Sequence, residues 1–200
     1  ELIACATQAV RQASDGRAFV RRASEVIGTP VRIISARREA ALSFLGAASR
    51  HSARREWALV DLGGASTEDP PRPEERARLR RAALRVLPGA PDGDVERLVA
   101  TGGTASNLPL LLSKRMPPAI LTTADLLECA MRLDRDPART VAARFGLLPN
   151  RVKAMRGGVE ALLLFLDWYG LAVLHVSHEG LRHGMLLAYL ERGSDWWRDG

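Results

Sequence analysis

The sequence predicts an α/β fold with mainly right-handed connections between its strands. The first observation behind this prediction is that short apolar segments alternate with longer segments of helical periodicity along the chain. The second is that apolar segments run directly into paired glycines in two places, at residues 63–64 and at residues 102–103. The third is the composition, because 46% hydrophobic and 26% charged residues are ordinary for a globular protein of 200 residues.

The N-terminal part is expected to hold two strands and two helices. The apolar run LIACAT predicts the end of a strand, and the β-branched run VRIIS at residues 31–35 predicts another strand. Residues 16–27 carry apolar side chains at helical spacing, and residues 37–46 are predicted to form the second helix.

The rest of the chain continues this alternation. Strands are expected at residues 57–62, 98–100 and 172–177. Helices are expected at residues 72–87, 106–112, 122–133, 150–169 and 180–192. Thr122 and Asp125 have the spacing of a capping box, which would open the helix that begins there.

Composition narrows the classes of partner. The net charge is +6, and the arginines that carry it are scattered along helices while aromatic residues make up only 5% of the chain. That leaves little material for stacking on bases, so we expect no nucleic-acid partner. No uncharged apolar run is long enough to cross a membrane, so we expect no membrane association. Cys5 and Cys129 are too few for a disulfide framework and predict buried thiols in a cytoplasmic protein.

Two glycine segments of the chain are alike, LVDLGGASTE at residues 59–68 and VATGGTASN at residues 99–107. Backbone N–H groups exposed in such turns form an anion-binding concavity, to which Ser66, Thr67 and Thr104 can add hydroxyl donors. Either segment alone could be a tight connection between a strand and a helix, but the pair favours a phosphate site. Neither segment is a Walker A loop or a G-x-G-x-x-G motif.

Asp61 lies directly before the first glycine pair, where a strand is expected to end. A carboxylate that faces a phosphate is repelled unless a cation lies between them. Asp61 is therefore a candidate ligand of Mg²⁺, directly or through water. The alternative is an aspartate that caps the turn.

Five segments, in order, resemble the exopolyphosphatase and guanosine pentaphosphate phosphohydrolase family, a branch of the superfamily that includes actin, sugar kinases and Hsp70. These segments are ATQAVRQAS, VRIISARREAALSFLGA, LVDLGGASTE, ATGGTASNL and VSHEGLRHGML. The resemblance implies an actin-like (ribonuclease H-like) ATPase-type fold. It assigns residues 1–50 to the end of the first lobe, residues 55–192 to the second lobe and residues 193–200 to a tail.

The resemblance also implies roles for particular residues. Glu39 matches the family's catalytic glutamate, which acts as a general base on the attacking water, and Arg11 would clamp phosphate. From the residues alone, Glu39 could equally be a carboxylate at a helix N-terminus and Arg11 a surface arginine. The expected phosphate-binding residues are Arg11, Gly63, Gly64, Ala65, Ser66, Thr67, Gly102, Gly103 and Thr104, and the expected metal ligands are Asp61 and Glu39.

The chain departs from the family's pattern. It has no first phosphate loop of the DLGTNS type, and Glu68 runs directly into Asp69 without the family's β-hairpin. Ala65 stands where the family's loop has its third glycine. We therefore expect a fold that lacks segments and an encoded protein that is longer, with sequence before Glu1 and after Glu68. The alternative is a trimmed, inactive protein.

The expected activity is hydrolysis of terminal phosphoanhydride bonds in inorganic polyphosphate, guanosine pentaphosphate or both, by Mg²⁺-assisted attack of water. One alternative is a non-catalytic module that binds polyphosphate or guanosine tetraphosphate. Another is a relative of sugar kinases or ATPases, which would hold a nucleotide behind ATGGT. A homodimer is compatible with the resemblance.

Overall fold

The computed structural model describes residues 1–50, 56–63, 73–87, 89, 94–112 and 120–199. The chain forms two compact units. The first unit comprises Glu1–His51 and Glu179–Gly200, and the second comprises Ser52–His178. Each unit is described by itself.

The first unit is built on two short parallel strands, β1 (Ala4–Ala6) and β2 (Val31–Ile33). Helices α1 (Gln8–Gln12) and α2 (Gly16–Ile27) lie between these strands in the chain. Helix α3 (Ala36–Ala48) follows β2, and α9 (Leu181–Arg192) with a 3₁₀ turn, η1 (Gly193–Asp195), completes the unit. The α2 bounds coincide with the predicted residues 16–27.

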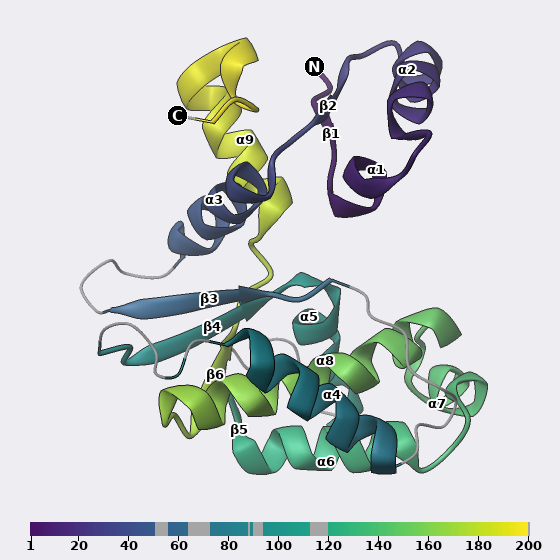
Figure 1. The fold of residues 1–200 in the computed structure, drawn as a ribbon, viewed down its shortest axis with the longest axis vertical. Coiled ribbons are helices and arrows are strands. Elements are labelled where there is room, and N and C mark those ends of the chain that lie inside the picture. Colours follow the sequence, from purple (N-terminus) through teal and green to yellow (C-terminus); the bar gives the residue numbers. More distant parts are fainter. Residues whose placement is uncertain (51–55, 64–72, 88, 90–93, 113–119, 200) are drawn as a thin grey trace. The chain divides into compact units, whose positions relative to one another are not determined.

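Helices α3 and α9 lie side by side (Figure 1) and meet at two glycines. A Cβ atom placed on Gly184 would overlap the carbonyl oxygen of Leu42 and lie 2.6 Å from its carbonyl carbon. A Cβ atom on Gly46 would overlap the carbonyl oxygen of Gly180. The two backbones are therefore in direct contact, which side chains at these positions would prevent.

The C-terminal residues pack into the first unit. Trp196 is only 4% exposed and joins a core that includes Ile34, Leu42 and Met185. Arg38, in the first turn of α3, donates a hydrogen bond from Nε to the carbonyl oxygen of Trp196 at 2.9 Å. The sequence-based division placed residues 180–192 in the second lobe and residues 193–200 in a tail, whereas the contacts group both segments with α3.

The second unit contains a four-stranded sheet with the strand order β3-β4-β6-β5. Strands β3 (Trp57–Asp61), β4 (Arg97–Thr101) and β6 (Val173–Val176) are parallel, and β5 (Ile120–Thr122) runs antiparallel to β6. The helices of this unit are α4 (Pro73–Val86), α5 (Gly102–Leu111), α6 (Thr123–Asp134), α7 (Ala138–Phe145) and α8 (Pro149–Tyr169).

Helix α8 is the centre of the helical layer, since it contacts α4, α5, α6 and α7 (Figure 1). Its Arg156 is 2% exposed and donates hydrogen bonds to the carbonyl oxygens of Leu133 and Asp136. Burial of a guanidinium is tolerated there because those bonds satisfy it. The same bonds fasten the C-terminal end of α6, so α8 organises its neighbours through polar as well as apolar contacts.

The structure differs from the predicted elements in a few places. Helices α1 and α7 and strand β5 were not predicted, because each is too short to show a clear period. Helix α5 begins at Gly102 rather than at residue 106, so the second glycine pair forms the first turn of a helix. The capping box is confirmed: the Thr122 hydroxyl accepts from the Asp125 amide while the Asp125 carboxylate accepts from the Thr122 amide.

Candidate functional site

Glu39 lies in the first turn of α3, at a helix start that the sequence encodes locally. Ser35 is the N-cap residue, and its hydroxyl oxygen accepts a hydrogen bond from the Arg38 amide at 2.9 Å. A carboxylate in the first turn is favoured by the helix dipole. The N-cap therefore fixes where α3 begins and, with it, where Glu39 stands.

Arg11, in the last turn of α1, is brought to Glu39 by the fold of the first unit. Its Nη1 donates to the carbonyl oxygen of Ile34 at 2.8 Å and to Oε2 of Glu39 at 3.2 Å. The two side chains are 27% and 28% exposed, so neither is freely solvated. Two residues predicted for one site thus form an ion pair, although their roles in binding and catalysis stay predictions.

The pKa of Cys5, which lies on β1, depends in part on the charge of Glu39. Burial, and after it the negative charge of Glu39, raise the pKa of the Cys5 thiol to about 11. Its Sγ lies 3.5 Å from Sδ of Met185. Both cysteines are free thiols, Cys129 buried and Cys5 half-buried, which agrees with their expected role as small packing residues.

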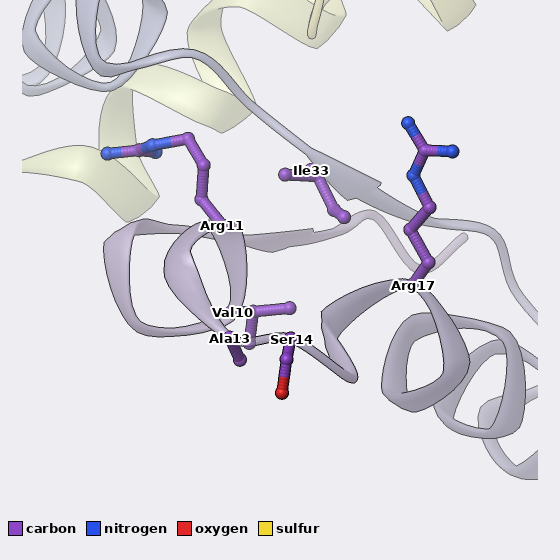
Figure 2. Close-up of a pocket in the computed structure, with 6 residues that line it drawn as sticks. All are labelled: Val10, Arg11, Ala13, Ser14, Arg17 and Ile33. Atoms are coloured by element: carbon purple, nitrogen blue, oxygen red, sulfur yellow. The ribbon is translucent and has the colours of Figure 1, made fainter.

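A cavity of about 510 Å³ opens beside Arg11 in the first unit. Figure 2 shows the side chains of Arg11 and Arg17 on either side of Ile33. The lining residues are Val10, Arg11, Ala13, Ser14, Arg17 and Ile33. Arg11, which is paired with Glu39, and Arg17 are the charged groups of this lining, and the other lining residues are uncharged.

In the second unit, Asp61 and Gly102 lie at neighbouring strand ends. Strands β3 and β4 pair in parallel, with Asp61 opposite Thr101. Gly102 has a φ of +91°, and a Cβ atom on it would lie 2.8 Å both from Oδ1 of Asp61 and from the carbonyl oxygen of Leu62. Gly102 is therefore required by its own conformation and by the closeness of the β3 end.

The next two residues of the glycine segment are packed rather than open. A Cβ atom on Gly103 would overlap Nη1 of Arg151 and lie 2.6 Å from its Cζ. Thr104 is 1% exposed, and its hydroxyl has no hydrogen-bond partner among the residues that the structure describes. Thr104 was predicted as a hydroxyl donor to phosphate, but its side chain is buried against α8 at Gly158.

The predicted site residues therefore fall into groups. Arg11 and Glu39 meet in the first unit, and Asp61 meets Gly102 in the second. Gly63, the first residue of the first glycine pair, is exposed. Gly64, Ala65, Ser66 and Thr67 lie outside the described residues.

Arg151 was missed by the sequence analysis. It lies in the first turn of α8, far along the chain from Gly103, and an arginine in a helical segment of an arginine-rich chain carries no distinguishing signal.

Among the described residues, the second unit supplies few ligands for the expected magnesium ion. Mg²⁺ is usually held by one or two carboxylates together with substrate phosphates and water. Asp61 supplies one carboxylate beside the first turn of α5, and no group of three or more His, Cys, Asp or Glu side chains able to hold a metal occurs among the described residues. The arrangement suits an ion that arrives with phosphate better than an all-protein metal cage.

No helix within the described residues has both the length and the apolar character needed to cross a membrane. This agrees with the absence of long apolar runs in the sequence.

The mixed sheet of the second unit, with polar groups at the neighbouring ends of β3 and β4, belongs to an α/β fold that matches solved structures over 74% of their length. Residues 1–69 match the model of the Ppx/GppA phosphatase family, which confirms the resemblance found in the sequence. This is the stretch that carries Arg11, Glu39 and the first glycine segment.

Solved structures extend the likeness over most of the chain. A Ppx/GppA phosphatase from Aquifex aeolicus is 23% identical with a TM-score of 0.71, and the match covers 93% of this chain and 74% of that one. An exopolyphosphatase from Cytophaga hutchinsonii is 20% identical with a TM-score of 0.84, and the match covers 94% of this chain and 74% of that one. At such identities the likeness establishes the fold.

Proposed function

We propose that this protein hydrolyses terminal phosphoanhydride bonds of inorganic polyphosphate, guanosine pentaphosphate or both. The observation that carries the proposal is the Arg11–Glu39 pair, with 3.2 Å between Nη1 and Oε2, inside the segment that matches a phosphatase family. A carboxylate held by a cation at a helix start is a group that can orient water, and the cation beside it can meet a phosphate.

In this proposal the residues have separate tasks. Glu39 accepts a proton from the attacking water, and Arg11 holds the carboxylate and contacts the phosphoryl group. The amides in the first turn of α5 face the negative charge of the remaining phosphates, as helix N-termini do. Asp61 would be a ligand of Mg²⁺, which would neutralise charge on the phosphate oxygens.

A cytoplasmic location and a homodimer belong to the same proposal. The free thiols of Cys5 and Cys129 support a reducing compartment. The mass of the protein in solution, measured by light scattering, tests the dimer.

Phosphate release from polyphosphate, guanosine pentaphosphate and ATP, each with and without Mg²⁺, tests the activity. We expect release from one or both of the first two substrates and little from ATP. Binding without release would point to the non-catalytic module, and release from ATP alone would point to an ATPase or kinase relative. Either of these results contradicts the proposal.

A further inference from the structure

Residues 196–199, which we call the 196–199 segment, make polar contacts with the start of α3. Arg38 donates from Nε to the carbonyl oxygen of Trp196 at 2.9 Å, and its Nη2 donates to the same oxygen. The Ser35 hydroxyl donates to Oδ1 of Asp199 at 2.8 Å, while it accepts from the Arg38 amide at 2.9 Å. The N-cap and the first turn of α3 are therefore both tied to the 196–199 segment.

Apolar and aromatic contacts join the same segment to the strand before α3. Trp196 is 4% exposed and shares a core with Ile34, which is 1% exposed and lies between β2 and α3. The guanidinium of Arg32, on β2, lies over the ring of Trp197, with 4.9 Å from Cζ to the ring centroid, as in a cation–π contact. The 196–199 segment therefore contacts β2, the connection that follows it and the first turn of α3.

These contacts reach the backbone that anchors the Arg11–Glu39 pair. Arg11 donates to the carbonyl oxygen of Ile34, the residue that shares a core with Trp196. The Glu39 amide donates at 2.9 Å to the carbonyl oxygen of Ser35, the residue whose hydroxyl contacts the 196–199 segment. A carboxylate that acts on water has to be held within about 0.5 Å of its productive position. Residues that hold this backbone therefore bear on the chemistry without touching the substrate.

We propose that the 196–199 segment positions Glu39, and that Arg38 is the positioning residue through which the segment acts on the first turn of α3. This inference rests on the proposed function and adds to its site a part of the chain distant in sequence. The contact suits Arg38 because Trp196 directly follows η1, and the last carbonyl oxygens of a helix lack partners within it. The alternative is that β2 and the N-cap fix the start of α3 by themselves.

The first experiment measures hydrogen exchange of the backbone amides in the full chain. The test variants are Arg38→Met, which removes the donors, and Arg38→Lys, which restores one cationic donor. The matched control is Arg37→Met, which makes the same change at the neighbouring, exposed arginine. Trp197→Leu removes the cation–π contact and leaves Arg38 in place, so it tests the same segment independently.

We expect the Glu39 amide to exchange roughly tenfold faster in Arg38→Met, as for the loss of hydrogen bonds from a charged group. Trp197→Leu should change exchange in the same direction, Arg38→Lys should show a smaller increase, and Arg37→Met should stay within about twofold of the parent. The amides of α2 should exchange as in the parent, because the loosening is confined to the start of α3.

The second experiment measures phosphate release from polyphosphate, with kcat and KM determined separately for each folded variant. We expect Arg38→Met to lower kcat by roughly tenfold to a hundredfold while KM changes little, because a misplacement of ~1 Å can cost ~10²-fold in rate. Arg38→Lys should recover part of the rate, and Arg37→Met should retain the parent's rate.

The proposal is overturned if the Glu39 amide exchanges alike in Arg38→Met and Arg37→Met. It is also overturned if exchange at Glu39 rises while kcat per folded molecule stays at the parent's value, or if the α2 amides speed up equally, since the loss would then be global. A parent that releases no phosphate would contradict the proposed function instead. The exchange of the Glu39 amide would still decide whether the 196–199 segment holds the start of α3.

Discussion

At the scale of single residues, the Arg11–Glu39 ion pair is the observation that bears most directly on the proposed chemistry. The sequence left Arg11 open as a surface arginine, but Arg11 is anchored by the Ile34 carbonyl oxygen and by Glu39. A guanidinium fixed at two points loses little further freedom when it meets a phosphate. The pair is therefore already arranged for the proposed chemistry.

We expect Glu39→Gln to abolish turnover while leaving polyphosphate binding nearly intact. The amide keeps the shape of the side chain and loses the basic oxygen, and loss of a general base typically costs ~10²–10⁴-fold in rate. Phosphate release and calorimetric binding measure the two effects. Glu25→Gln, an exposed glutamate on α2, is the control. Parent-like rates in Glu39→Gln would reduce Glu39 to a helix-end carboxylate.

The pKa of Cys5 gives an independent measure of the negative charge on Glu39. Its pKa of about 11 is due first to burial and second to the charge of Glu39. Because a nearby negative charge opposes thiolate formation, Glu39→Gln should lower the pKa of Cys5 while leaving it above the ordinary value of 9.0. Thiolate absorbance followed against pH, in a Cys129→Ala background, measures it. An unchanged titration in Glu39→Gln would show that the carboxylate does not act on Cys5.

At the scale of elements, the first unit is held by a contact between two helix backbones. Gly46 on α3 and Gly184 on α9 leave no room for a Cβ atom, and the obstacle in both cases is backbone that cannot turn aside. Because Glu39 stands in the first turn of α3, the α3–α9 contact also supports the candidate base.

Gly184→Ala should therefore destabilise the protein, by about 1–3 kcal/mol as is typical of overpacking. Chemical denaturation measures the free energy of unfolding. Gly89→Ala is the control, because a Cβ atom there meets nothing within 4 Å. Equal stability of the Gly184→Ala and Gly89→Ala variants would mean that the helices can move apart at little cost.

At the scale of the whole molecule, the predicted site residues come from both compact units. Arg11 and Glu39 belong to the first, and Asp61 and Gly102 belong to the second. The chain spans 74% of the length of each of the two solved structures described above. Within the described sheet, β3 is an edge strand, and free edges of this kind are usually covered.

If residues of both units take part in one reaction, the losses in rate caused by substitutions in the two units should not be additive. We expect Asp61→Ala to weaken the Mg²⁺ dependence of turnover, and the Glu39→Gln/Asp61→Ala double variant to be little slower than the worse single variant. Rates of phosphate release over a range of Mg²⁺ concentrations measure this. Strictly additive losses would mean that the two carboxylates act independently.

The sequence alone was sufficient for the features that depend on neighbouring residues. The period of residues 16–27 located α2, the Thr122–Asp125 spacing located the start of α6, and the segment around Glu39 pointed to the phosphatase family. Each of these signals is contained in a few consecutive side chains, because capping and amphipathic periodicity are local interactions.

Contacts between distant segments were decided by the tertiary structure. The glycine pair at residues 102–103 looked like an open turn, yet it begins α5 and receives Arg151 from α8. Residues 193–200 looked like a tail, yet Trp196 is buried beside α3. The physical reason is that a side chain's charge, space and partners are set by elements packed on it from elsewhere in the chain, and their packing leaves no trace in the local pattern.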